Sequence, residues 1–148
     1  MTYTFEHLDT DADLRKSFGL MQTLRPHLTN EQTYRQQLSR QLTQGYRLLA
    51  ACRDQTMVGL AGYRELENLL YGRFIYVDDL VVDPDMHRQG LGASLLSRVR
   101  EEATRRDCDH LVLDTGLHMA LAQRFYFRQG LLAKGMHFTQ SLLARSPQ

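Results

Sequence analysis

The chain contains no tryptophan and only two cysteines and three prolines in 148 residues, and its formal net charge is +1. This near-neutral balance argues against a general nucleic-acid binder, which would carry a strong excess of lysine and arginine. Cys52 and Cys108 lack the spacing of a metal site. We therefore expect free thiols and no bound metal.

Long apolar runs are also missing. No stretch approaches the length of a membrane span, and residues 1–6 lack the charged and apolar regions of a signal peptide. We therefore expect a cytoplasmic protein with neither nucleic acid nor membrane as a partner. The length suits one domain over residues 1–148, large enough to bury a proper core.

Hydrophobic patterns along the chain predict strands interleaved with helices. The predicted strands cover residues 4–8, 46–52, 57–63, 74–82, 110–113 and 131–142. The predicted helices lie near residues 14–21, 29–45, 91–103 and 117–129. Thr29 and Gln32 are typical of a capping box at the start of the second helix. A helix between two buried strands implies a right-handed crossover and parallel pairing. The expected fold class is therefore α/β with α+β character, a mixed and mostly antiparallel sheet flanked by helices.

The most informative segment runs from Leu80 to Leu96. An apolar, β-branched run ends at Asp83-Pro84, which a strand interior would not tolerate, and two glycines precede a helical pattern. Glycine lets backbone N–H groups close on a phosphate, a helix N-terminus favours an anion, and Arg88 adds a cation. This order predicts a site for a phosphorylated cofactor. The alternative is a plain helix N-terminus whose glycines serve only a tight turn.

Two nucleotide-binding loops are excluded by what surrounds these glycines. A Walker loop needs a lysine after its last glycine, and none follows Gly92. A dinucleotide fingerprint needs a third glycine, and Leu95 stands in its place.

The segment resembles motif A of the GNAT superfamily of acyl-CoA-dependent N-acyltransferases, in which Gln/Arg-x-x-Gly-x-Gly/Ala follows a hydrophobic strand. Here the motif covers His87, Gly90 and Gly92, with His87 where the family usually has Gln or Arg. The resemblance implies a GNAT-like fold and acetyl-CoA as cosubstrate. Its pyrophosphate would lie on the loop, and its pantetheine arm against the strand end. The residues implied on these elements are Leu80, Val81, Val82, His87, Arg88, Gln89, Gly90, Leu91, Gly92, Ala93 and Ser94.

A second match to the same family lies near residue 126. The family often ends this helix with a pattern similar to Asn-x-x-Ala-x-x-Leu/Phe-Tyr-x-x-x-Gly-Phe/Leu. The matching residues are Ala122, Phe125, Tyr126, Gly130 and Leu131. Met119 stands where the asparagine would contact the pantetheine arm, and we count it as cofactor-binding. The resemblance makes Tyr126 the general acid toward the departing CoA thiolate. Without the resemblance, Tyr126 is a boundary tyrosine.

Two adjacent carboxylates interrupt the apolar strand. An amine acceptor arrives as ammonium and needs a base, for which Asp78 and Asp79 are candidates. Strand alternation puts Asp78 on the face of Leu80 and Asp79 on the other face. No pattern between Asp79 and Val82 indicates a bulge. Diamine acetyltransferases of the family have Glu-Asp-Phe-Phe-Val where this chain has residues 78–82, which implies that Asp78 is the base. The alternative is a carboxylate bonded to backbone or to an arginine.

Charge is segregated along the chain. Residues 54–85 contain seven acidic side chains and two arginines, and the following helix reverses this balance. Such a field would suit CoA on one side and a cationic amine on the other; the alternative is solvated surface. We expect transfer of an acetyl group from acetyl-CoA to a primary amine of a small molecule by direct attack. Two alternatives stay open: a protein lysine or N-terminal acetyltransferase, and a non-catalytic acyl-CoA-binding sensor. A homodimer is also left open.

Overall fold

The computed structural model describes residues 2–143. The chain divides into two compact units, Met1–Leu113 and Asp114–Gln148. Within the described residues, every strand belongs to the first unit. No helix within residues 2–143 has the length and apolar character to span a membrane. Cys52 and Cys108 are free thiols.

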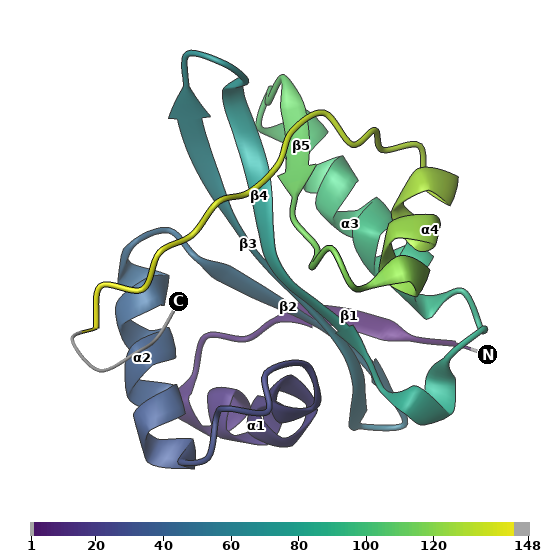
Figure 1. Cartoon of the computed structure of the whole chain (residues 1–148). Helices are drawn as coiled ribbons and strands as arrows, with labels where there is room; N and C mark the ends of the chain where they lie inside the picture. The colour runs from purple at the N-terminus through teal and green to yellow at the C-terminus, as the bar shows by residue number, and fades with distance from the viewer. Residues whose placement is uncertain (1, 144–148) are drawn as a thin grey trace. The chain divides into compact units, whose positions relative to one another are not determined.

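A five-stranded sheet forms the framework of the first unit (Figure 1). Its strands, in spatial as well as chain order, are β1 (Thr4–His7), β2 (Arg47–Arg53), β3 (Thr56–Asn68), β4 (Gly72–Val82) and β5 (His110–Leu113). Neighbouring strands are antiparallel except β4 and β5, which are parallel. Helix α3 (Leu91–Arg105) connects this parallel pair. The predicted mixed sheet and its single parallel pairing are confirmed.

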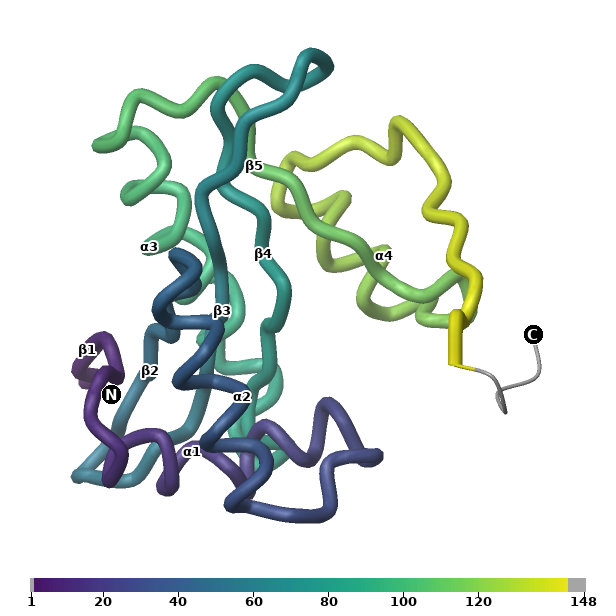
Figure 2. The backbone as a smooth tube through the Cα atoms, turned by 90° about the vertical axis from the view of Figure 1, so that its left-hand side faces the viewer, coloured from purple at the N-terminus to yellow at the C-terminus, as the bar shows by residue number. Residues whose placement is uncertain are grey.

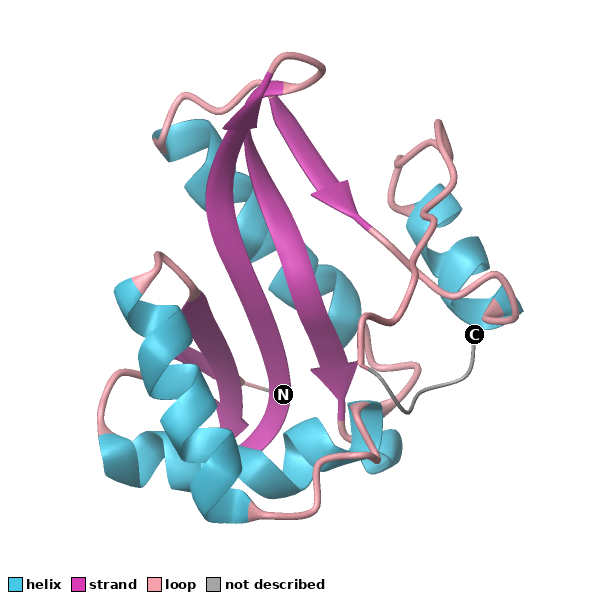
Figure 3. Ribbon diagram, turned by 60° about the vertical axis from the view of Figure 1, so that its left-hand side comes forward, coloured by secondary structure: helices cyan, strands magenta, loops and turns pink. Residues whose placement is uncertain are grey.

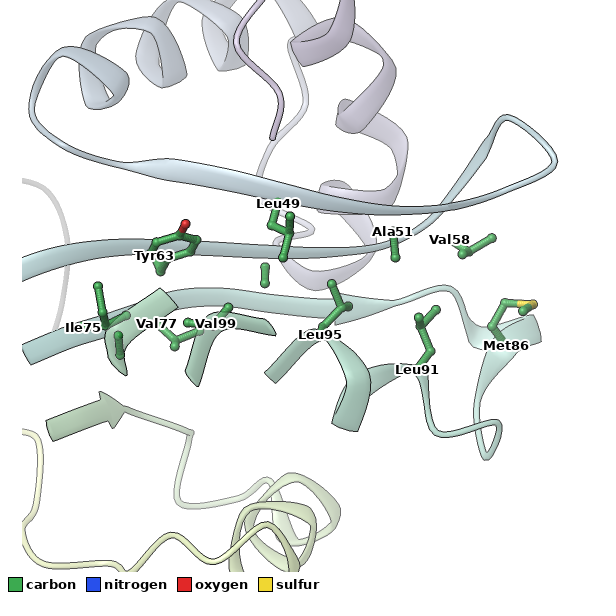
Figure 4. Close-up of a cluster of buried hydrophobic side chains, with 12 residues drawn as sticks. Leu49, Ala51, Val58, Tyr63, Ile75, Val77, Met86, Leu91, Leu95 and Val99 are labelled. Carbon is green, nitrogen blue, oxygen red and sulfur yellow. The ribbon is translucent and has the colours of Figure 1, made fainter. Parts of the chain in front are cut away.

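The sheet has a hydrophobic cluster on each face. Successive β2 side chains point to opposite faces and so belong to different clusters. Leu48 and Ala50 pack with α1 (Asp11–Leu24) and α2 (Glu31–Thr43), whereas Leu49 packs with α3. Figure 4 shows the α3 side, where the helix directs a row of apolar side chains at the sheet.

Gly59 on β3 lets α3 lie close to the sheet. A Cβ at this position would come within 2.8 Å of the Leu95 side chain. The first turns of α3 can therefore pack closely against β3.

The start of α2 differs from the sequence-based prediction by one residue. Asn30 is the N-cap, and its side-chain oxygen accepts a hydrogen bond from the Thr33 N–H at 2.9 Å. The predicted capping box from Thr29 is therefore wrong. Asparagine caps a helix as well as threonine does, and two consecutive candidates leave the choice to the chain path.

The second unit contains helix α4 (Ala120–Arg128). The helix begins later than predicted because a turn precedes it, in which the Met119 N–H donates to the Gly116 carbonyl at 3.0 Å. The predicted strand at 131–142 is wrong: within residues 2–143 this segment pairs with no strand (yellow in Figure 2). Its apolar content matched a strand, but a strand also needs a hydrogen-bonding partner.

Candidate functional site

The edge of β4 on the β5 side is open beyond Val77 in one sense: no strand among residues 2–143 pairs with it there. β5 pairs only with residues 74–77 of β4, because it ends at Leu113, the partner of Val77 (Figure 3). The opposite edge of β4 continues to pair with β3 as far as Val82. Within residues 2–143, alternate N–H and C=O groups from 78 to 82 therefore lack a strand partner. Such an edge can bind an extended ligand that carries amide groups.

A β-bulge lies where this open edge begins. Gly62 of β3 pairs with Asp79 and Tyr63 pairs with Val77, so Asp78 has no residue opposite it. The sequence-based assignment of Asp78 and Leu80 to one face assumed regular alternation, which this bulge interrupts. Leu80 and Val77 both pack in the α3-side cluster although they are three positions apart, because the bulge reverses the alternation.

The bulge also corrects the predicted faces of the two carboxylates. Asp79 accepts a hydrogen bond from Tyr46, which packs in the α1–α2 cluster. Asp79 therefore lies on the α1–α2 face of the sheet and Leu80 on the other face, as alternation predicts. Asp78 does not share the face of Leu80. Its carboxylate pairs with Arg64, whose guanidinium lies over the same Tyr46 ring. Both carboxylates therefore point to one side of the sheet.

Asp78 is held by a single side chain. Its Oδ2 accepts a hydrogen bond from Arg64 Nε at 2.9 Å, and the two side chains remain 23% and 25% exposed. Burial raises the pKa of Asp78 above its ordinary value, and the Arg64 hydrogen bond and charge oppose that rise. A raised pKa brings a carboxylate closer to the range of a useful general base. Its other oxygen, Oδ1, has no partner among residues 2–143.

Asp79 is the centre of a larger network. The Tyr46 hydroxyl donates to Asp79 Oδ2 at 2.8 Å, and Arg25 donates to Oδ1 from Nε and Nη2 at 3.2 and 3.0 Å. Arg25 Nη2 also donates to the backbone carbonyl of Asp78 at 2.8 Å, so it binds the bulge directly. Burial, followed by the Asp79 charge, raises the pKa of Tyr46 well above its usual range. Both Asp79 oxygens are thus engaged, which makes Asp79 a structural residue.

Gly62 is required by this network. It pairs with Asp79 across the strands, and a Cβ there would overlap the phenol of Tyr46. Tyr46 is fully buried, so its hydroxyl reaches Asp79 only because residue 62 has no side chain. The sequence-based analysis missed Arg25, Tyr46, Gly62 and Arg64. The carboxylates could have indicated that arginines were needed, but not which ones.

The predicted acidic side is not an unpaired acidic surface. Glu65, Asp78 and Asp79 are each paired with an arginine. The Asp83 side chain accepts from the Asp85 N–H in the 3₁₀ turn η1 (Pro84–Met86). Most of the negative charge that the sequence placed along this stretch is therefore neutralised or used locally.

The loop that follows η1 turns sharply into α3. Arg88 has φ +67° and Gly90 has φ +77°, a left-handed conformation that glycine adopts without strain. The exposed His87 ring lies with Nε2 3.2 Å from the Val82 carbonyl, and the Gln89 side chain accepts from the Tyr3 hydroxyl at 3.4 Å. The loop is thus tied to the end of β4 and to the N-terminal segment.

The first turn of α3 has the free donors that an anion needs. No side chain among residues 2–143 caps the helix, and its first turn contains no acidic residue. The first N–H bonded within the helix is that of Ser94, which reaches the Gly90 carbonyl at 3.0 Å. Within residues 2–143, no acceptor is bonded by the N–H groups of Arg88, Gln89, Gly90, Leu91, Gly92 and Ala93. Leu91 is buried, which fixes the direction of this turn. The arrangement fits a pyrophosphate.

The predicted residues of the second unit lie on α4. Met119 is the N-cap, it makes no side-chain capping bond, and it is 44% exposed. Tyr126 is partly buried, with its ring 5.4 Å from that of Phe125.

The chain is similar to known acetyltransferases. Residues 12–131 match the model of the acetyltransferase (GNAT) family. Over 98 residues the chain is 33% identical to an aminoalkylphosphonate N-acetyltransferase of Salmonella typhimurium, covering 66% of this chain and 62% of that relative. The chain thus spans less than two thirds of the length of this relative.

Solved structures share the fold. A transcriptional regulator from Bacillus halodurans has a TM-score of 0.84 at 20% identity, covering 95% of this chain and all of the other. An aminoglycoside N-acetyltransferase in complex with CoA has a TM-score of 0.83 at 15% identity, covering 95% of each chain. From the match over residues 12–131, the chain belongs to the GNAT acetyltransferase family.

Proposed function

We propose that this chain is a cytoplasmic, acetyl-CoA-dependent N-acetyltransferase that acetylates a primary amine of a small molecule. One observation carries the proposal: the open edge of β4 leads from the carboxylate of Asp78 directly to the uncapped N-terminus of α3. The relative that is 33% identical acts, by its name, on aminoalkylphosphonates, which are small amines.

The cofactor residues divide into two groups. The backbone N–H groups from Arg88 to Ala93 would hold the pyrophosphate, with the guanidinium of Arg88 as an added cation. The backbone of Leu80 to Val82 would pair with the amide groups of the pantetheine arm. His87 contributes its imidazole ring beside the loop, and Met119 offers apolar contact where an amide is absent.

The chemistry is direct transfer. Bound acetyl-CoA supplies a thioester. Asp78 accepts a proton from the substrate ammonium, directly or through water, and the neutral nitrogen attacks the thioester carbonyl carbon. The C–N bond forms as the C–S bond breaks, the Tyr126 hydroxyl donates a proton to the leaving sulfur, and the second amine proton leaves to solvent. The products are an amide, free CoA thiol and one proton.

The acid role is tested with Tyr126→Phe. This variant should lower kcat about 100-fold because it removes the proposed proton donor, while the KM for acetyl-CoA stays unchanged. Steady-state kinetics with both substrates varied measures the two effects separately. Tyr71→Phe is the matched control, since Tyr71 lies in the turn between β3 and β4, where its ring packs against Phe74 and His110. An unchanged kcat for Tyr126→Phe would refute the role.

The reaction class is tested with a panel of amines, aminoglycosides and peptides. Turnover of small amines with release of CoA thiol supports the proposal. Turnover of peptides alone would show a protein acetyltransferase. Tight acetyl-CoA binding without any turnover would show a sensor domain.

A further inference from the structure

We propose that the acceptor is an aminoalkyl acid, a small amine that also carries a phosphonate, phosphate or carboxylate group, and that Arg64 and Arg25 bind this anion. The inference rests on the proposed function, because it names the substrate class of the same site.

The charge balance at the bulge carries the first step. Asp78 is paired with Arg64, and Asp79 is paired with Arg25, so the two carboxylates and two guanidinium groups sum to zero. A purely cationic acceptor such as a polyamine would find no net negative charge here and would meet two cations. An acceptor with charges of both signs complements the site at both ends.

Unused hydrogen-bond donors carry the second step. Arg64 donates to Asp78 only through Nε, so its two terminal nitrogens have no hydrogen-bond partner among residues 2–143. The guanidinium plane is held in position, since it lies 5.6 Å from the centre of the buried Tyr46 ring. Arg25 engages Nε and Nη2, which leaves Nη1 without a partner in the same described part of the chain.

The arrangement of these donors points to an oxyanion. Both arginines remain accessible, with 25% and 42% of their side chains exposed. A guanidinium offers paired donors in a fixed plane, which matches the oxygens of a carboxylate or phosphonate. The Oδ1 of Asp78 belongs to the carboxylate that Arg64 holds and has no partner among residues 2–143, so it can accept from the substrate ammonium. One end of an aminoalkyl acid is thus bound by the arginines and the other by the proposed base.

The test compares kcat/KM for four acceptors of similar length: 3-aminopropylphosphonate, 3-aminopropyl phosphate, 4-aminobutyrate and butylamine. We expect at least one anionic acceptor to exceed butylamine by roughly 10- to 100-fold, the range that charge-assisted hydrogen bonds supply. The three anionic acceptors identify which group is preferred. Arg64→Met should remove most of this ratio, and Arg64→Lys should restore part of it.

The ratio between acceptors separates anion binding from other effects of the substitution. Arg64 also lowers the pKa of Asp78. That effect applies equally to butylamine, so it cancels in the ratio of kcat/KM between an anionic acceptor and butylamine. Arg47→Met, an exposed arginine on β2, is the matched control and should leave the ratio unchanged. Thermal unfolding and acetyl-CoA binding verify that each variant is folded.

Three results would overturn the inference: equal kcat/KM for anionic acceptors and butylamine, a preference for diamines, or a ratio that Arg64→Met leaves intact. In each of these cases amines are still acetylated, so the proposed function survives. If no amine is acetylated at all, the proposed function fails first.

Discussion

The loop that enters α3 and the bulge on β4 are joined by a few residues, yet they are built in opposite ways. In the loop, backbone N–H groups from Arg88 to Ala93 are left without acceptors in the described part of the chain. At the bulge, both carboxylates and one backbone carbonyl are already engaged by side chains from elsewhere in the first unit. The loop provides backbone donors, on which we propose that the pyrophosphate of acetyl-CoA binds. The bulge provides side chains, which can differ between members and so can set specificity.

The largest expected effect on stability comes from adding a side chain at Gly62, which pairs with Asp79 at the bulge. Gly62→Ala would place a methyl group against the Tyr46 phenol and separate its hydroxyl from Asp79, so we expect the free energy of unfolding to fall by about 3 kcal/mol. Urea denaturation measures the loss. In the Tyr46→Phe background the same substitution should cost less, because the overlapping hydroxyl is gone. Equal losses in both backgrounds would contradict this account. Acetyl-CoA affinity of the folded variant should be preserved.

A substitution in the loop before α3 should have the opposite effect: a smaller loss of stability and a loss of acetyl-CoA affinity. Gly90→Ala forces a side chain into a left-handed conformation at a position where space is free, so its cost is conformational, about 1–2 kcal/mol. We expect acetyl-CoA to bind about tenfold more weakly by calorimetry. Gly19→Ala is the matched control, since Gly19 lies within α1 with open space around it; it should stabilise the protein by about 0.5–1 kcal/mol and leave binding unchanged. Unaltered binding by Gly90→Ala would contradict a role for the turn.

The smallest expected effect is a shift in the pH dependence of kcat/KM, which follows from the pKa of Asp78. Burial raises the pKa of Asp78, so kcat/KM should fall as the pH decreases through a midpoint above the ordinary aspartate range. The Arg64 cation favours the ionised carboxylate. Arg64→Met should therefore move this midpoint upward by about one pH unit. Butylamine is the acceptor to use, because it has no anion for Arg64 to bind. A downward movement would mean that another group controls the acid limb.

The same rise in pKa has a consequence for stability. The folded state holds the Asp78 proton more tightly than the unfolded state does, so ionisation of Asp78 lowers stability as the pH rises through its folded pKa. Arg64→Met should enlarge that loss.

Prediction from the sequence succeeded where contacts are local. The order of β4, the loop and α3 followed from Pro84, Gly90 and the apolar spacing after it, because each acts on the backbone within a few residues. It failed where a partner was needed. Asn30 replaced Thr29 as the cap, and residues 131–142 have strand-like composition without a strand to pair with in the described chain.

Within β4, too, the local pattern was predictable from the sequence and the long-range contacts were not. The apolar pattern predicted β4, but Arg25 is 54 residues and Tyr46 33 residues from the carboxylate they bind. An ion pair across such a separation exists only once the sheet has brought the segments together. Nothing near Asp78 indicates which arginine will reach it.

By itself, therefore, the sequence determined a sheet with one parallel pairing and a glycine turn before a helix, and its motifs indicated the family. Those features depend on backbone preferences of neighbouring residues. Only the tertiary structure decided that both carboxylates lie on one face, that each is paired with an arginine, and that the terminal nitrogens of Arg64 have no partner within residues 2–143. These depend on one extra residue in β4 and on side chains distant in sequence, because a bulge reverses alternation and an ion pair forms only where folding places its partners.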